Sequence, residues 1–311
     1  MKKCNYFKIA TLLLLLLCSI QTFAQYESED DPNDPANFKR ERGIHVGAFM
    51  GGYIPNKYTA NNYNGYGFDL QGNKNDFANS WMNQKINYQY GGGYGSQPDL
   101  IATALGVEAN PKEWTFAESD MPNHMKYQFG FLLGINTQYL LNKNNGIMLN
   151  VNFVKLNVTG SFTMQRKKKN SPPPSYDSLL TFGIVGGEQR LFIQLGYQRM
   201  ITNNQKTNLF IEGGLNINST QFQKNEIEIN SLTIDLVTNF NQIAYPTTTY
   251  FIRKPSKIGL GAFAGLGLDL VIGKRVISQI VYQPTYDKIN IGFDPKLKLQ
   301  HAAGLRVYYR L

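Results

Sequence analysis

The chain has 311 residues and a formal net charge of +9 at neutral pH, and its two cysteines, Cys4 and Cys18, both lie near the N-terminus. The rest of the chain therefore offers no disulfide framework, no thiol nucleophile and no cysteine ligand for a metal. Three lysines before residue 25 carry +3 of the charge, which leaves +6 for the remainder. That balance suits anionic lipid headgroups and does not indicate a nucleic-acid partner.

Residues 1–24 have the pattern of a secretory signal peptide. A positive start containing Lys2, Lys3 and Lys8 precedes an apolar run, and small and polar residues follow up to Ala24. The apolar run is too short to cross about 30 Å of hydrocarbon as a helix. Leucine rather than a small residue precedes Cys18, which argues against a lipid-modified cysteine. We expect export, cleavage after Ala24 and a flexible periplasmic tail over residues 25–42.

Apolar and polar or small residues alternate over eight later stretches. These stretches are approximately 43–53, 127–141, 147–158, 190–198, 209–218, 258–270, 276–286 and 297–311. Side chains of a β-strand point alternately to opposite faces, so each stretch predicts a strand with one apolar and one polar face. In the last stretch, for example, Leu305, Val307 and Tyr309 alternate with Arg306 and Arg310.

The connections between these stretches alternate between long and short. The long ones are 54–125, about 166–189 and 224–257, and the short ones are 142–146, 202–207 and 273–274. Residues 54–125 have no sustained periodicity and far exceed an ordinary loop length, which is typical of functional or disordered segments. An even strand number with tight turns at one end and longer loops at the other is the plan of an outer-membrane barrel.

The predicted fold class is therefore all-β: an eight-stranded antiparallel up-and-down transmembrane β-barrel over residues 43–311 with long outward loops. The alternative is a soluble sandwich or lipocalin-like barrel, which would place its apolar side chains inside. Lipid offers no water to backbone groups, so the last strand should pair with the first. In the third strand the apolar parity slips near Lys155 to Leu156 and Val158, which indicates either a β-bulge or exit from the membrane.

The alternating strands, the tyrosine-rich composition and the segment Leu191-Phe192-Ile193-Gln194-Leu195-Gly196-Tyr197 resemble the small outer-membrane β-barrel proteins of Bacteroidota-type bacteria, a group that includes PorT-like proteins. The resemblance covers most of residues 43–311, without the long first loop. It implies residence in the outer membrane, and some relatives resemble components of secretion systems. Such barrels often end on an aromatic residue, whereas this chain ends on Leu311.

Six charged residues fall on the predicted inner faces of the strands. They are Arg190, Glu212, Asp269, Lys298, Arg306 and Arg310. An unpaired charge inside a narrow barrel is costly, so we expect a paired network with Asn and Gln side chains. Such a network either fills the lumen as a polar plug or forms an ion path. An eight-stranded barrel has room inside only for side chains, which favours the plug.

Two outward segments are candidates for contact with a partner. Arg166, Lys167, Lys168 and Lys169 form a basic run that could bind phosphates of anionic lipid or an acidic protein, or could be a solvated loop. The first loop carries several aromatic residues that suit either protein or glycan contact or packing onto the barrel rim. These are Trp81, Tyr88, Tyr90, Trp114 and Phe116.

The signals for catalysis and for cofactors are weak. His45, His124 and His301 have no spacing typical of a metal site. A glycine-rich segment at residues 91–95 lacks the Lys-Ser/Thr and the strand-to-helix context of a phosphate loop. Ser119, Asp120 and His124 lie close in sequence, as in barrels that modify lipids, but without a defined spacing. We expect no cofactor and no metal.

The sequence thus predicts an integral outer-membrane barrel with a structural or interaction role and no enzymatic activity. One form of that role is a subunit of an envelope or secretion assembly, in which a protein partner binds the outward loops or the periplasmic tail. The first alternative is a narrow pore or transporter for small solutes. The second is a lipid-modifying barrel enzyme.

Overall fold

The computed structural model describes residues 42–69, 73–93, 98–110, 112–167, 178–202, 204, 206–237, 256–272, 275–292 and 295–311. The expected signal peptide, and the expected tail up to residue 41, lie outside these residues. Among the described helices, none is both long and apolar enough to cross a bilayer.

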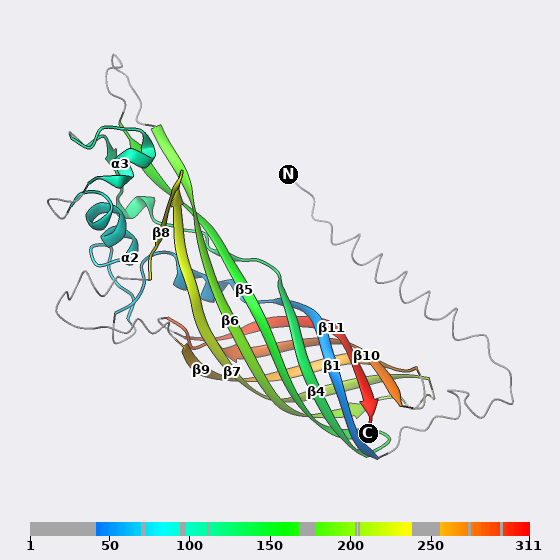
Figure 1. The fold of residues 1–311 in the computed structure, drawn as a ribbon. Coiled ribbons are helices and arrows are strands. Elements are labelled where there is room, and N and C mark those ends of the chain that lie inside the picture. The colour runs from blue at the N-terminus through cyan, green and yellow to red at the C-terminus, as the bar shows by residue number, and fades with distance from the viewer. Residues whose placement is uncertain are drawn as a thin grey trace.

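Eight long strands form one closed antiparallel ring (Figure 1). They are β1 (Gly43–Ile54), β4 (Gly130–Asn142), β5 (Asn145–Arg166), β6 (Ser178–Met200), β7 (Thr207–Ile229), β9 (Ser256–Val271), β10 (Val276–Lys288) and β11 (Leu297–Arg310). Each strand pairs with its neighbour along the chain, and β1 pairs with β11. The predicted fold class is confirmed: the chain is an eight-stranded up-and-down barrel.

The closing pair has the predicted register. Ala48 lies opposite Val307 and Met50 lies opposite Leu305. Met50, Leu305 and Val307 are 53%, 37% and 42% exposed, so this pair presents an apolar outer surface. The first and last strands therefore leave no free edge at the seam, as a spanning sheet requires.

The two ends of the barrel differ in the length of the connections between the strands (Figure 1). Short turns connect β4 to β5, β6 to β7 and β9 to β10 at the end where the C-terminus lies. We call this the turn end. The long connections emerge at the opposite end, which we call the loop end.

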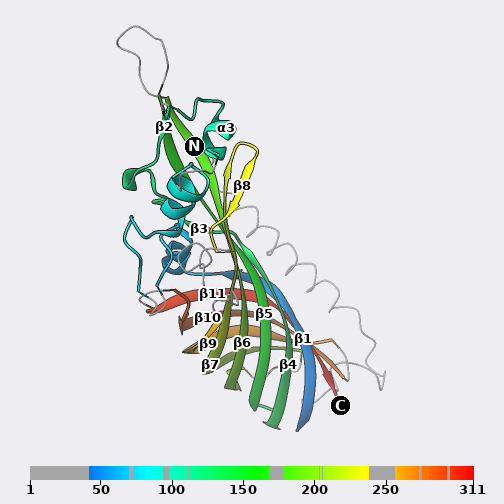
Figure 2. The same cartoon turned by 60° about the vertical axis from the view of Figure 1, so that its left-hand side comes forward.

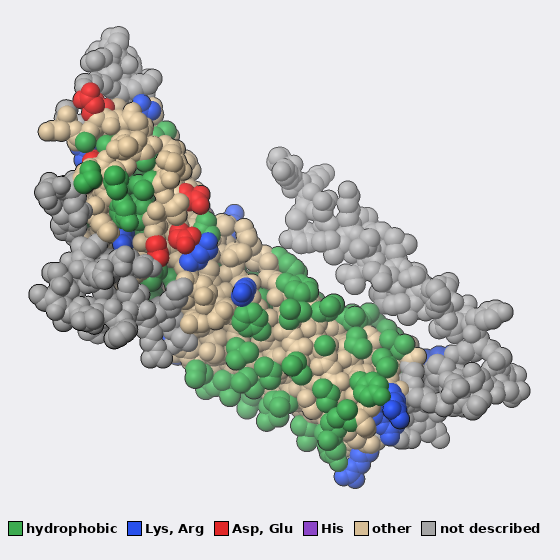
Figure 3. All heavy atoms as spheres, viewed as in Figure 1, with side chains coloured by type: hydrophobic (Ala, Val, Ile, Leu, Met, Phe, Trp, Pro, Cys, Tyr) green, Lys and Arg blue, Asp and Glu red, His purple; other side chains and the backbone are tan. Residues whose placement is uncertain are grey.

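An apolar belt surrounds the barrel between these ends. Outward side chains such as Ile135, Leu149, Ile193, Leu215 and Leu260 are between 40% and 69% exposed. Their inward neighbours are mostly small or polar and buried. Figure 3 shows the belt as a broad region of hydrophobic side chains along the barrel. A surface of this kind fits hydrocarbon. In water, the belt would be a far larger exposed apolar patch than soluble proteins show.

Three strands continue well beyond the belt at the loop end. β5, β6 and β7 have 22 or 23 residues each, about twice the ~9–11 residues that a tilted strand needs to cross a bilayer. Shorter elements join their outer parts: η2 (Lys57–Tyr63), α2 (Trp81–Asn83), η3 (Gln84–Gln89), α3 (Leu100–Leu105), β2 (Trp114–Thr115), η4 (Glu118–Asp120), β3 (Lys126–Tyr127) and β8 (Leu232–Asp235). We call this assembly the loop-end domain; Figure 2 shows its helices on one side of the extended sheet.

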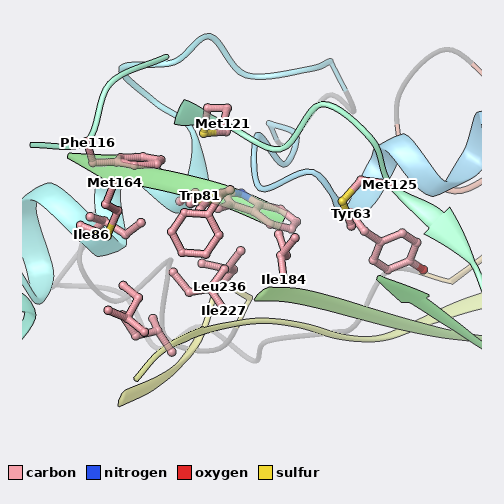
Figure 4. Close-up of a cluster of buried hydrophobic side chains, with 14 of the residues drawn as sticks. Tyr63, Trp81, Ile86, Phe116, Met121, Met125, Met164, Ile184, Ile227 and Leu236 are labelled. Atoms are coloured by element: carbon pink, nitrogen blue, oxygen red, sulfur yellow. The ribbon is translucent and has the colours of Figure 1, made fainter. Parts of the chain in front are cut away.

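The loop-end domain has its own hydrophobic core. Twenty-three buried residues form this core, which is more than a rim contact would need. The helices supply Trp81 and Ile86, and the sheet supplies Ile184 and Ile227 (Figure 4). The Phe222 ring stacks on Tyr63, with centroids 4.7 Å apart. Most of the described residues of the first loop therefore pack as a small domain.

Several predicted details of the strands need correction. The expected connection at about 166–189 is too long, because β6 already begins at Ser178. The expected loop 224–257 begins too early, because β7 continues to Ile229 and then turns into β8. The parity slip near Lys155 does not come from a bulge in β5, since its register with β6 runs unbroken from Asn145 to Arg166. Instead, Val154 and Leu156 face the interior while Lys155 faces outward into water. The change of apolar side marks the end of the lipid belt.

Candidate functional site

The barrel lumen contains a buried ion pair that spans its width. Arg306 of β11 donates from Nη1 and Nη2 to the two carboxylate oxygens of Glu212 on β7, at 2.6 and 2.8 Å. The two strands are not neighbours in the ring. Both side chains are almost fully buried. Two parallel charge-assisted bonds fix the geometry of the pair.

Glycines on β9 make room for carboxylate side chains inside the barrel. A Cβ atom added to Gly265 would lie 2.7 Å from Cγ of Glu212, and one added to Gly261 would collide with the carboxylate of Asp287. The alternation of Gly with apolar residues along β9 thus serves both faces. The large apolar side chains face lipid on the outside, and the glycines, which have no side chain, leave space for carboxylates on the inside.

Amide side chains complete the network around the ion pair. Gln283 donates to Oε1 of Glu212 at 3.0 Å, and Gln198 donates to Oε2 at 3.3 Å. Gln279 donates to Asp269 at 2.7 Å and contacts Gln198 at 3.3 Å. Gln138 donates to Gln198 at 2.6 Å. The network therefore links six of the eight strands, and it holds both carboxylates within a hydrogen-bonded interior.

A second buried ion pair lies where the barrel meets the loop-end domain. Arg190 Nε donates to Glu188 at 2.6 Å, and its two terminal nitrogens donate to Tyr53 at 3.0 Å and to Tyr127 at 3.1 Å. The Tyr63 hydroxyl donates to the other oxygen of Glu188 at 2.7 Å. Arg190 also donates to the Thr59 hydroxyl at 3.2 Å.

This second cluster ties the first loop to the barrel wall. Its members come from β1, η2, β3 and β6. Nearby, Asn62 of η2 donates to the carbonyl of Ile291 at 2.8 Å. η2 thus takes part in the cluster around Arg190 through Thr59 and Tyr63, and in the hydrogen bond to Ile291 through Asn62. These contacts hold η2 across the loop end of the lumen.

The predicted six-residue network is therefore only partly assembled. Arg306, Glu212 and Asp269 belong to one network, whereas Arg190 belongs to the second cluster. Lys298 lies at the loop end with Nζ 4.8 Å from the Tyr58 ring centre, and Arg310 lies half-buried at the turn end. These two residues stand at the two ends of β11, and their assignment to a luminal network stays a prediction.

Glu188 was missed by the sequence reasoning. It lies two residues before Arg190 and therefore on the same face of β6. The signal was available, but the predicted strand began at Arg190 itself. Asp287 was missed for a related reason: the predicted strand ended at residue 286, whereas β10 runs to Lys288 and buries Asp287 against Asn216, which donates to it at 2.6 Å.

The structure describes only part of the basic run 166–169, whereas it places all five aromatic residues of the first loop. Arg166 ends β5, and the backbone N–H of Lys167 donates to the carbonyl of Glu113 at 2.8 Å, while Lys168 and Lys169 lie outside the described residues. Of the aromatics, Trp81, Trp114 and Phe116 are buried in the core of the loop-end domain, Tyr90 is half-buried and Tyr88 is exposed. Packing therefore accounts for most of them.

The residues considered for catalysis do not converge. Asp120 accepts one hydrogen bond from Thr163 and another from the backbone of Ala117, so its two oxygens serve the fold. Ser119 and His124 are exposed. His45 is buried inside the barrel, and His301 contacts the Tyr282 hydroxyl at 2.7 Å. Within the described part of the chain, no cluster of three or more His, Cys, Asp or Glu residues could hold a metal.

No protein-family model and no curated protein matches the chain. Solved structures that resemble it include the outer membrane protein OprG from Pseudomonas aeruginosa, with 10% identity, a TM-score of 0.40, and coverage of 89% of this chain and 100% of that one. The N-terminal β-barrel domain of OprF from the same organism has 9% identity and a TM-score of 0.34, with 88% and 100% coverage. Ail, the attachment invasion locus protein of Yersinia pestis, has 12% identity and a TM-score of 0.32, also with 88% and 100% coverage. The closed ring and its apolar belt identify this chain's own fold as an eight-stranded transmembrane β-barrel of the outer-membrane type.

Proposed function

We propose that the protein is an outer-membrane anchor that displays the loop-end domain at the cell surface for contact with a partner protein. In this orientation the turn end lies in the periplasm, as in other barrels with short turns at one end. The observation that carries the proposal is the separate 23-residue core of the loop-end domain. Closing an eight-stranded barrel does not need a second core, because luminal side chains already fill it.

The extended sheet offers this domain a broad polar face. Beyond Lys155, most outward residues of β5 and β6 are small or amide side chains, including Asn157, Ser161, Thr181 and Gln189, and Leu179 adds one exposed apolar side chain. Thr163 and Thr181 are direct cross-strand neighbours. A sheet face with few long, flexible side chains loses little conformational entropy when another protein covers it. Membership of an envelope or secretion assembly, as the PorT-like resemblance implies, is one form of this role.

A narrow pore is the alternative that the lumen bears on most directly. A small cavity lies among Tyr53, Asn152, Gln194 and Gln283. The Arg306–Glu212 and Arg190–Glu188 pairs are fixed by several hydrogen bonds each, so they oppose ion passage unless they rearrange. Steady, ion-selective current from the pure protein in a planar bilayer would favour the pore and contradict the anchor. We propose a non-enzymatic role, since Ser119, Asp120 and His124 form no catalytic arrangement.

Purification in mild detergent followed by mass spectrometry tests the anchor. The test variant carries Ser161→Lys and Thr181→Lys on the exposed sheet face, and the control carries Thr207→Lys at the turn end. We expect a stoichiometric partner to remain with the wild type and the control, and to be lost from the test variant. A partner that the control loses and the test variant keeps would place the contact in the periplasm and contradict the proposal.

A further inference from the structure

A girdle of basic side chains surrounds the turn end of the barrel. Its members come from every part of the ring: Arg42, Lys143, Arg199, Lys206, Arg275 and Arg310. Figure 3 shows blue side chains gathered at this end of the molecule. Among the described residues there, the acidic side chain is Asp269, which is fully buried and hydrogen-bonded to Gln279.

These cations follow directly on the lipid-facing belt. Arg199 comes two residues after Tyr197 on the same outward face of β6, and Arg42 comes two residues before Ile44 of β1. Two residues of a strand span about 7 Å. The outer surface therefore changes from apolar to cationic within the depth of a lipid headgroup region.

Two of the arginines are held at the edge of the belt by outward-facing tyrosines. Arg42 Nε donates to the Tyr139 hydroxyl at 3.0 Å, and Arg275 Nη1 donates to the Tyr309 hydroxyl at 3.1 Å. The Arg42 guanidinium also lies 5.8 Å from the centre of the Tyr139 ring. Each guanidinium has five N–H donors, so one bond to a tyrosine leaves others for a phosphate.

We propose that this basic girdle binds the phosphate groups of net-anionic phospholipids in the periplasmic leaflet. The occupant must present an anion beside hydrocarbon, because the cations and the apolar belt share one continuous surface. A phospholipid has that arrangement, and arginine recognises phosphate through paired N–H donors. An anionic leaflet adds about 1 kcal/mol of attraction for each basic residue near its surface.

Spin-labelled lipids test the proposal with the complete protein in phosphatidylcholine bilayers. The measured quantity is the association constant of labelled phosphatidylglycerol relative to labelled phosphatidylcholine. We expect the wild type to prefer phosphatidylglycerol. In the triple variant Arg42→Gln, Arg199→Gln, Arg275→Gln, the ratio of the two association constants should fall by a factor of about two or more. Replacing the same three arginines by Lys should retain most of the preference. Electrophoretic mobility before and after heating checks that each barrel is folded.

A charge-matched control separates the girdle from net charge. The variant Lys74→Gln, Lys112→Gln, Lys167→Gln removes three charges from the loop-end domain, away from the belt, and should keep the wild-type preference. Equal loss in both variants would contradict the proposal. The acidic segment with Glu27, Glu29, Asp30, Asp31 and Asp34 is the competing occupant. A weak wild-type preference that rises when these five residues become amides would overturn the lipid assignment, as would no preference in any form.

Discussion

The two halves of β5 have the same backbone and opposite hydrophobic faces. Near the turn end, Leu149 and Val151 point outward and Asn150 points into the barrel. Beyond Lys155, the outward residues are polar, and Leu156 and Val158 are buried. The register with β6 is continuous through the change. Which face of a strand is apolar therefore follows the surrounding solvent, lipid in one half and water in the other.

The comparison predicts that the two halves depend on different interactions. In the barrel, Arg306→Met would leave Glu212 buried without its cation and should cost about 3–5 kcal/mol of unfolding free energy. Urea unfolding in detergent, followed by the heat-dependent mobility of the barrel, measures this. The double variant Arg306→Met with Glu212→Gln should recover much of the loss. Equal destabilisation of the single and double variants would show that the ion pair does not explain the effect.

In the loop-end domain, removal of apolar volume should be most costly. Phe222 of β7 stacks on Tyr63 and meets Trp81 edge-on, so Phe222→Ala should destabilise this domain by about 3–5 kcal/mol. Both tryptophans of the chain, Trp81 and Trp114, are buried in that domain, and their fluorescence therefore reports its unfolding.

A control for Phe222 lies on the same strand. Phe210 is also fully buried in β7 but belongs to the apolar cluster inside the barrel. Phe210→Ala should lower the stability of the barrel and leave the tryptophan transition in place. If both variants shift the two transitions together, the domain and the barrel unfold as one unit and the comparison fails.

A charge on the outer surface should have a cost that depends on position along β5. Val151→Arg places a cation against lipid and should cost about 2–4 kcal/mol. Ser161→Arg places the same side chain in water and should change stability by less than about 0.5 kcal/mol. Unfolding in lipid vesicles measures both. Similar costs at the two positions would mean that the belt does not end between them.

The smallest predicted effect is a pH dependence of the loop-end domain. Burial lowers the pKa of Lys85 to about 8, and the carboxylate of Asp235 partly offsets this shift. Between pH 8 and the ordinary lysine pKa of 10.5, the unfolded chain binds more protons than the folded one, so unfolding free energy should rise with pH. Burial beside Glu188 raises the pKa of Tyr63, which opposes this trend above about pH 10.

Lys85→Met provides the check on that dependence. Tryptophan fluorescence should show that the midpoint of urea unfolding no longer rises between pH 8 and 10 in this variant. A rise that persists unchanged would assign the titration to another group.

The face to which a residue points is predicted correctly where the whole strand has the same surroundings, lipid outside and the lumen inside. In β9 and β11, a single alternation runs the full length, so faces, ends and the closing pair with β1 follow from the sequence. The outer half of β7 escaped prediction because water replaces lipid there, and because an extra residue near Gln223 shifts the register with β6. The fold of residues 54–125 also escaped, since its short helices are held by tertiary contacts rather than by a local period.

The candidate site divides in the same way. Arg306 and Glu212 lie within their strands and Asp269 lies near the end of β9, and the alternation along each strand could predict that all three point into a narrow barrel. Glu188 could be predicted beside Arg190, but Thr59, which accepts from Arg190, and Tyr63, which donates to Glu188, could not, because both belong to η2, which reaches the lumen only through the folded first loop. Sequence parity identifies which residues point inward, and loop structure decides which of them meet.

A spin-label scan along the outward face of β5 tests the central claim most directly. The only cysteines, Cys4 and Cys18, lie in the expected signal peptide, so single cysteines can be introduced at every second position from Ile147 to Gln165. In lipid vesicles, the labels should be accessible to oxygen and shielded from a water-soluble nickel relaxant up to Phe153. From Lys155 onward, the accessibilities should reverse. Shielding from nickel that extends unchanged to Gln165, or nickel access at Leu149, would contradict a membrane boundary at this point in the strand.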